Sequence, residues 1–169
     1  ECNLNNEIGL PLTVLRAPVD ARFLVLEMGA GKPGDIAYLV RIGQPHVVLV
    51  NNVAPAHLER LGSLDGVAEA KGAIYDGLPP GGTAVVNADD AYAERFVRRI
   101  GARRVLRFGL EQPADVAARA VQLGAGVQFQ GGINSGKTVN DNCAVRAAVP
   151  ELTTVAGVSP AVNPGNPYC

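Results

Sequence analysis

The sequence lacks an excess of charge of either sign, and this excludes several classes of partner. Its 15 basic and 16 acidic residues leave a formal net charge of -1. Proteins that bind nucleic acid or an anionic membrane through their surface field carry a marked basic excess. We therefore expect this chain to bind neither nucleic acid nor a membrane surface.

Long apolar runs and cysteines are also scarce. No apolar run approaches the roughly 18 residues that a membrane span needs, and the sequence opens without the pattern of a signal peptide. The three cysteines, Cys2, Cys143 and Cys169, are too few for a dense disulfide framework. These absences predict a cytoplasmic protein, and 169 residues are enough for one domain with a buried core.

The apolar runs that are present are short and alternate with helical patterns. Phe23–Leu26 is the first, and four apolar residues in a row are typical of a strand buried on both faces. Further strands are predicted at His46–Val50, Thr83–Val86 and Arg103–Phe108, with helices between them. This alternation predicts an α/β fold, a mainly parallel Rossmann-like sheet with helices on both faces. Shorter strands within residues 114–130 would form a small accessory β region.

Polar side chains follow three of the predicted strands at the point where each strand ends. In chain order these residues are Glu27, then Asn51 with Asn52, then Asn87 with Asp89 and Asp90. The carboxyl ends of parallel strands lie along one edge of a sheet, where open α/β sheets bind ligands. We therefore expect these groups to converge at one site.

His57 and Lys71 follow the second strand and are candidates for the same site. Glu27 and His57, completed by water, would suit a divalent cation, because Mg²⁺ usually takes one or two protein ligands plus phosphate oxygens. Spacing alone also allows plainer interpretations. Glu27 would then be a solvated strand end, His57 a surface residue at a helix start, and Lys71 a solvated helical lysine.

Residues 131–138, Gly-Gly-Ile-Asn-Ser-Gly-Lys-Thr, fit the phosphate-loop pattern G-x-x-x-x-G-K-[ST]. Such a loop surrounds phosphates with backbone N–H groups, and here it would add the charge of Lys137 and the hydroxyl of Thr138. Val127–Gln130 would be the preceding strand and Val139–Val149 the following helix. A glycine-rich linker is the alternative.

Several runs of residues between Asn3 and about Gln130 resemble, in the same order, the central domain of the Mur ligase family. The runs are Asn3–Thr13, Leu26–Ala30, Pro33–Leu39, Ala56–Glu59, Gly62–Gly72 and Asn87–Asp90. The resemblance divides the chain into residues 1–130, similar to that domain, and a tail rich in Gly, Asn and Pro at residues 131–169.

The resemblance implies a set of site residues. The family's matching glutamate and histidine bind Mg²⁺ and its matching lysine is carbamylated, so Glu27 and His57 are expected to hold the metal, and His57 and Lys71 to serve catalysis. The residues expected beside the substrate are Asn3, Asn5 and Asn6. The residues expected to bind ATP are Gly136, Lys137, Thr138 and Asn142.

The implied function is ATP-dependent peptide-bond ligation in the synthesis of peptidoglycan precursors. The branch that the runs match best adds D-alanyl-D-alanine to a UDP-N-acetylmuramoyl-tripeptide through an acyl phosphate. ATP, Mg²⁺ and that UDP-sugar peptide are the expected cofactors and substrate. The alternative is a non-catalytic fragment or engineered scaffold that keeps the fold and at most binds nucleotide, because the family's C-terminal domain has no match here.

The tail has two competing interpretations. In the family the phosphate loop precedes the Asn-rich run, which here is Asn3-Leu4-Asn5-Asn6, whereas in this chain the loop pattern lies after that run, at residues 131–138. In a circularly permuted domain, residues 139–169 would supply a helix, a strand and a link back to Asn3, with Cys169 beside Cys2. In the other interpretation the tail is unrelated or degraded, and Cys143 with Cys169 closes a loop or the cysteines stay free. The sequence leaves both open.

Overall fold

The computed structural model describes residues 4–118 and the strand segments at residues 122–123, 127–128, 131–133, 137–139 and 153–158. Strands and helices alternate through the first part of the chain, as predicted. In chain order the elements are α1 (Gly9–Arg16), β1 (Phe23–Glu27), α2 (Asp35–Gly43), β2 (Val47–Val50), α3 (Leu58–Leu61), α4 (Leu64–Asp76), β3 (Thr83–Asn87), α5 (Ala93–Ile100), β4 (Arg104–Gly109), β5 (Val116–Ala118), β6 (Gln122–Leu123), β7 (Val127–Gln128), β8 (Gly131–Ile133), β9 (Lys137–Val139) and β10 (Thr153–Val158).

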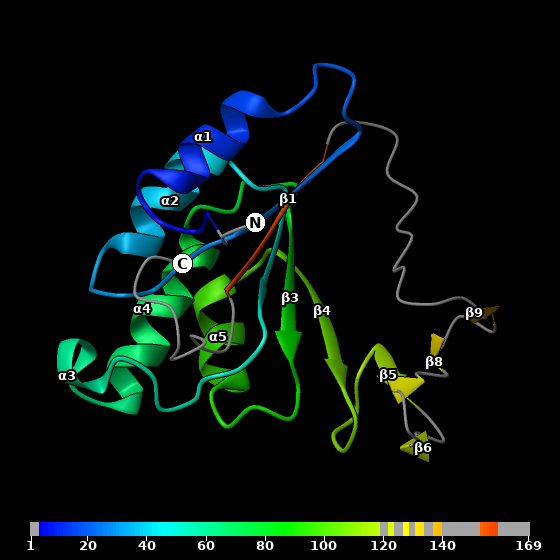
Figure 1. Cartoon of the computed structure of the whole chain (residues 1–169). Coiled ribbons are helices and arrows are strands. Elements are labelled where there is room, and N and C mark those ends of the chain that lie inside the picture. Colours follow the sequence, from blue (N-terminus) through cyan, green and yellow to red (C-terminus); the bar gives the residue numbers. More distant parts are fainter. Residues whose placement is uncertain are drawn as a thin grey trace.

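Most of the strands form one large sheet, and β6 and β7 pair separately. The order across the large sheet is β1-β10-β2-β3-β4-β5-β8-β9. Each pair from β1 to β5 in this order is parallel, and β8 and β9 are added antiparallel at the end. Figure 1 shows these last short strands lying away from the helices. The predicted α/β fold, with a mainly parallel sheet and an accessory β region, is confirmed.

β10 is the strand that the sequence patterns do not place. It lies between β1 and β2 and is parallel to both, with Val155 opposite Val25 and Val47. Its threonines and valines favour a strand, but local pattern carries no information on which strands it joins. The permutation interpretation expects a helix, a strand and a link in this part of the tail. The strand is present, Val139 ends β9, and residues 140–149 of the expected helix lie outside the described residues.

In the described part of the chain the helices cover one face of the sheet, so the predicted helices on both faces are not observed there. Apolar residues of α2, α4 and α5 form the core with the strand residues that point to that face, which are Leu26, Val48, Val50, Ala84 and Val86. On the other face of β1, Phe23 is 44% and Val25 is 74% exposed. The predicted burial of this strand on both faces is therefore wrong. β1 is an edge strand of the sheet, and the helices of the described residues lie over only one of its faces.

The helix boundaries follow signals in the sequence. α4 begins after Ser63, whose Oγ accepts a hydrogen bond from the N–H of Gly66 at 3.1 Å. α2 carries Asp35 in its first turn, where a negative charge is favourable, and ends at Gly43. None of the helices in the described part of the chain combines the length and apolar composition that crossing a membrane requires.

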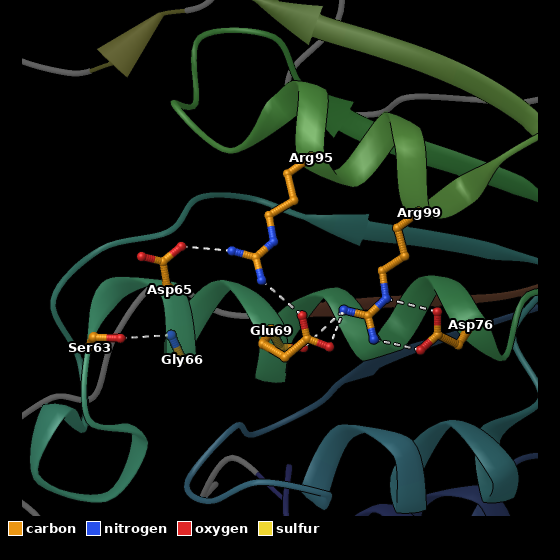
Figure 2. A network of polar contacts seen from close by, with 7 residues as sticks. All are labelled: Ser63, Asp65, Gly66, Glu69, Asp76, Arg95 and Arg99. Carbon is orange, nitrogen blue, oxygen red and sulfur yellow. Dashed lines mark hydrogen bonds and ion pairs between the residues drawn. The ribbon is translucent and has the colours of Figure 1, made fainter.

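Charged side chains join α4 to α5, as Figure 2 shows. Arg95 lies 2.7 Å from Asp65 and 3.0 Å from Glu69. Arg99 contacts Glu69 at 2.9 Å and makes paired hydrogen bonds to Asp76, from Nε to Oδ1 at 2.8 Å and from Nη2 to Oδ2 at 2.7 Å. Paired bonds of this kind are stronger and more directional than a single ion pair. The network therefore fixes α5 against α4.

We expect Arg99→Ala to lower the free energy of unfolding by about 1 kcal/mol, measured by urea denaturation. The value is modest because the acidic partners of Arg99 are more than half exposed. Arg98→Ala is the matched control, since Arg98 is exposed on the same helix and makes no ion pair with the described residues. The difference between the variants should shrink in high salt. Equal stability of the two variants at low salt would contradict the prediction.

Candidate functional site

β2 and β3 end in groups that are hydrogen-bonded to one another along the carboxyl edge of the sheet. Asn87 Nδ2 donates to the carbonyl oxygen of Asn51 at 2.9 Å. The N–H of Val53 donates to Asp90 Oδ2 at 2.6 Å, and the N–H of Tyr92 donates to Asp90 Oδ1 at 2.8 Å. The expected convergence is therefore observed for the ends of these two strands.

α4 brings Lys71 to the same edge. The residue is only 3% exposed, and its Nζ donates to the carbonyl oxygen of Asn52 at 2.8 Å. Burial lowers the pKa of Lys71, while the nearby Asp90 carboxylate acts in the opposite direction. Asn52 Oδ1 is itself buried without a hydrogen-bond partner in the described part of the chain. Lys71 is thus an inward-pointing lysine with an increased neutral fraction, and a solvated lysine is excluded.

Glu27 ends β1 and is held by the Asn-rich run. Asn5 Nδ2 donates to Glu27 Oε1 at 2.8 Å, and the carbonyl oxygen of Asn5 accepts from the N–H of Gly29 at 2.8 Å. Asn6 Oδ1 accepts from two N–H groups at the start of α1, at 3.1 and 2.8 Å. The sequence motif did not predict that Asn5 contacts Glu27. Asn3 lies outside the described residues.

His57 stands immediately before α3 and is half-buried. Its φ of 51° is in the left-handed region, which is strained for a residue with a side chain. Its carbonyl oxygen accepts from the N–H groups of Arg60 and Leu61, both at 2.9 Å. The His57 ring makes no hydrogen bond with any other described residue. The main chain of this turn is therefore fixed while the ring can bind a ligand.

The residue types at this edge fit a divalent cation that takes most of its ligands from a nucleotide. Within residues 4–118 and the described strands of the tail, no three His, Cys, Asp or Glu side chains form a group that could hold a metal. Mg²⁺ needs only one or two protein ligands when phosphate and water oxygens complete its shell. The Glu27 carboxylate is suited to that role. That Glu27 and His57 share the cation stays a prediction.

Asp89, by contrast, supports the structure of the edge. Its carboxylate accepts from the N–H groups of Leu110, Glu111 and Gln112, at 2.6, 3.1 and 2.8 Å. The bonds from Leu110 and Gln112 are the main cause of a lowered Asp89 pKa. A Cβ at Gly109 would lie 2.9 Å from Asp89 Oδ1, so a side chain there would displace the carboxylate from these bonds. Asp89 therefore fixes the turn after β4, and the sequence did not indicate which loop it holds.

The predicted phosphate loop is a β-hairpin in this structure. Gly131–Ile133 and Lys137–Val139 are the antiparallel strands β8 and β9, with Ile133 opposite Lys137. Glycine-rich segments also suit hairpins, and main-chain groups that pair with each other do not surround a ligand. β9 is seven strands from β1 in the sheet order, roughly 30 Å at the usual strand spacing. Lys137 and Thr138 are therefore not brought to Glu27.

The other predicted nucleotide-binding residues, Gly136 and Asn142, lie outside the described residues, as do the three cysteines. Binding of nucleotide by any of the four predicted residues stays a prediction. The two interpretations of the tail, and the cysteine pairing that each expects, stay open with it.

The family can now be assigned from a comparison with known protein families. Residues 1–145 match the Mur ligase middle domain. The chain belongs to the Mur ligase family. The match includes the carboxyl edge of the sheet with Glu27, His57 and Lys71, so the resemblance seen in the sequence is confirmed.

Relatives and solved structures agree with this Mur ligase assignment. The UDP-N-acetylmuramoyl-tripeptide--D-alanyl-D-alanine ligase of Escherichia coli K12 is 49% identical over 106 residues, which are 63% of this chain and 24% of that protein. A crystal structure of MurF from Acinetobacter baumannii has a TM-score of 0.74 at 32% identity, covering 79% of this chain and 29% of that one. MurF ligase from Thermotoga maritima, solved in complex with ADP, has a TM-score of 0.65 at 36% identity, covering 77% and 30%. The Mur ligase chain described here thus spans 24% of the length of its Escherichia coli relative.

Proposed function

We propose that this chain is the nucleotide-binding part of an ATP-dependent ligase that adds D-alanyl-D-alanine to a UDP-N-acetylmuramoyl-tripeptide in peptidoglycan precursor synthesis, in the cytoplasm. The observation that carries the proposal is the carboxyl edge of the sheet. There the half-buried carboxylate of Glu27, the strained His57 and the buried Lys71 all lie within runs that match the family. The name of the Escherichia coli relative and the ADP complex of the Thermotoga maritima neighbour support the substrate and the nucleotide.

The roles of the residues follow from their chemistry. Bound MgATP would supply the phosphoryl group that activates the substrate carboxylate as an acyl phosphate, which an amine then attacks. Phosphoryl transfer depends mainly on positioning and on neutralising charge. Glu27 and His57 would hold the cation, and Asn5 would line the substrate side, whereas the Asn6 side chain is engaged with N–H groups at the start of α1. The chain's own contribution is to keep these groups at fixed positions along one rigid sheet edge.

Lys71 would act as an anion rather than as a cation. An ammonium beside a bound Mg²⁺ repels the metal, whereas a carbamate formed with CO₂ carries a negative charge and two acceptor oxygens. Carbamate formation requires the neutral amine, and burial of Lys71 increases that form. The hydrogen bond from Nζ to the carbonyl of Asn52 already holds the side chain toward the edge.

The alternative is a chain that keeps the fold and at most binds nucleotide. One observation favours it: the hairpin at residues 131–139 lies at the end of the sheet opposite Glu27. In that arrangement Lys137 and Thr138, the described lysine and threonine of the loop pattern, are not close to the proposed cation. Absence of nucleotide binding would therefore favour this alternative over the ligase proposal, whereas nucleotide binding is compatible with both.

Titration of the chain with MgADP in a calorimeter tests the proposal. We expect binding, and we expect Glu27→Gln to raise the dissociation constant at least about tenfold, because it removes a charged metal ligand. Glu59→Gln is the control, since Glu59 is exposed on the neighbouring α3. Absence of MgADP binding by the unaltered chain would refute the nucleotide-binding role. An unchanged dissociation constant in Glu27→Gln would remove Glu27 from the site.

A further inference from the structure

We propose that Asn5 is a positioning residue for the cation site: its side-chain amide holds the Glu27 carboxylate in the orientation that binds the metal. The inference rests on the proposed function, because it needs Glu27 to be a metal ligand. It goes beyond that function by giving Asn5, expected only beside the substrate, a task at the cation.

Asn5 is hydrogen-bonded both to the side chain of Glu27 and to the main chain of Gly29. The Asn5 amide donates to Glu27 Oε1 at 2.8 Å, and the Asn5 carbonyl accepts from the N–H of Gly29 at 2.8 Å. One residue thus bonds to the carboxylate and to the main chain two positions after it. A neutral amide that donates to a carboxylate orients it without competing for the cation. Groups that orient metal ligands in this way contribute strongly to metal affinity.

Gly29 is the residue that permits this close approach. A Cβ at Gly29 would lie 3.1 Å from both the carbonyl oxygen and the side-chain Oδ1 of Asn5. An alanine there would displace Asn5 by a few tenths of an ångström while leaving Asn5 and Glu27 chemically intact. Gly29 has no positive φ, so the alanine introduces no backbone strain of its own.

The neighbouring Asn6 provides a matched control within the same segment. Its Oδ1 accepts from the N–H groups of Ile8 and Gly9 at the start of α1, at 3.1 and 2.8 Å. Asn6 therefore anchors the segment to α1, whereas Asn5 connects the segment to Glu27. Substitution of Asn6 tests the effect of loosening the helix start without removing the bond to the carboxylate.

The experiment measures Mn²⁺ binding to the full chain by water-proton relaxation, which does not depend on enzymatic activity. We expect Asn5→Ala to weaken Mn²⁺ binding about tenfold. Gly29→Ala should weaken it in the same direction, and Asn6→Ala should bind Mn²⁺ like the unaltered chain. Far-ultraviolet circular dichroism and the melting temperature of each variant show that binding is compared between folded proteins.

The outcomes separate this inference from the proposed function. If Glu27→Gln weakens Mn²⁺ binding while Asn5→Ala and Gly29→Ala both bind as the unaltered chain does, Asn5 has no positioning role and the cation site stands. If Asn6→Ala loses as much affinity as Asn5→Ala, the effect belongs to the segment as a whole and the inference is overturned. If Glu27→Gln leaves Mn²⁺ binding unchanged, or the unaltered chain binds none, both the cation site and the role of Asn5 are overturned.

Discussion

Gly66→Ala is expected to lower the free energy of unfolding by about 3 kcal/mol, because the added methyl group has no space. A Cβ at this position would lie 1.9 Å from the carbonyl oxygen of Leu61 and 3.0 Å from its carbonyl carbon. Both contacts are with main chain at the end of α3, so they cannot be relieved by rotating a side chain. α3 and the first turn of α4 would have to separate, and His57 at the start of α3 would move with them.

Urea denaturation measures the effect, with Gly81→Ala as the control. Gly81 is exposed, and its Cβ would meet no atom within 4 Å. Gly66 lies in α4, and at an open helical position alanine in place of glycine would stabilise the protein by up to about 1 kcal/mol. The sign of the stability change in Gly66→Ala therefore shows by itself whether the methyl group has space. A Gly66→Ala variant as stable as the unaltered chain, or more stable, would show that α3 and α4 are not packed as described.

Complete loss of a carbamate signal is the expected result of Lys71→Arg. In the unaltered chain, ¹³C-labelled CO₂ should give a carbamate resonance in the NMR spectrum once Mg²⁺ is present. Burial lowers the pKa of Lys71, so its neutral amine is available at lower pH than that of an exposed lysine. Arginine keeps the positive charge but forms no carbamate under these conditions.

Lys32→Arg is the control for this experiment, because the Lys32 side chain is 65% exposed and carries only a 3.9 Å ion pair to Asp35. Its substitution should leave the resonance unchanged. On lowering the pH, the signal of Lys71 should disappear as the amine becomes protonated. A resonance that survives in Lys71→Arg, or no resonance at saturating CO₂ and Mg²⁺, would refute the carbamate.

The sequence by itself determined the order and type of the elements up to β4. Apolar runs that end in Glu27, Asn51 and Asn87 predicted strands, and the intervening apolar stripes predicted helices. These signals are local, because the repeat of apolar side chains along a strand or a helix can be recognised within a short stretch of sequence. The convergence of the ends of β2 and β3 followed from the same signals, since the carboxyl ends of parallel strands share an edge.

Only the tertiary structure decided which groups meet. The local pattern around Lys71 is that of a solvated helical lysine, and only the family resemblance marked it as a site residue; its burial depends on the strands that α4 packs against. The bond from Asn5 to Glu27 spans 22 residues, and the bonds from Asp89 span 21 to 23. No local period encodes contacts across such separations.

The sheet positions of the strands are equally a tertiary property. The apolar run Phe23–Leu26 has the pattern of a central strand, yet β1 lies at the edge of the sheet. Its neighbour is β10, which comes from the last part of the sequence. Residues 131–138 have the pattern of a phosphate loop, yet Gly131–Ile133 and Lys137–Val139 pair as antiparallel strands, because a glycine-rich segment is compatible with both and its neighbours decide between them. Pairing of strands is settled by long-range burial and main-chain hydrogen bonding, which a pattern of neighbouring residues does not specify.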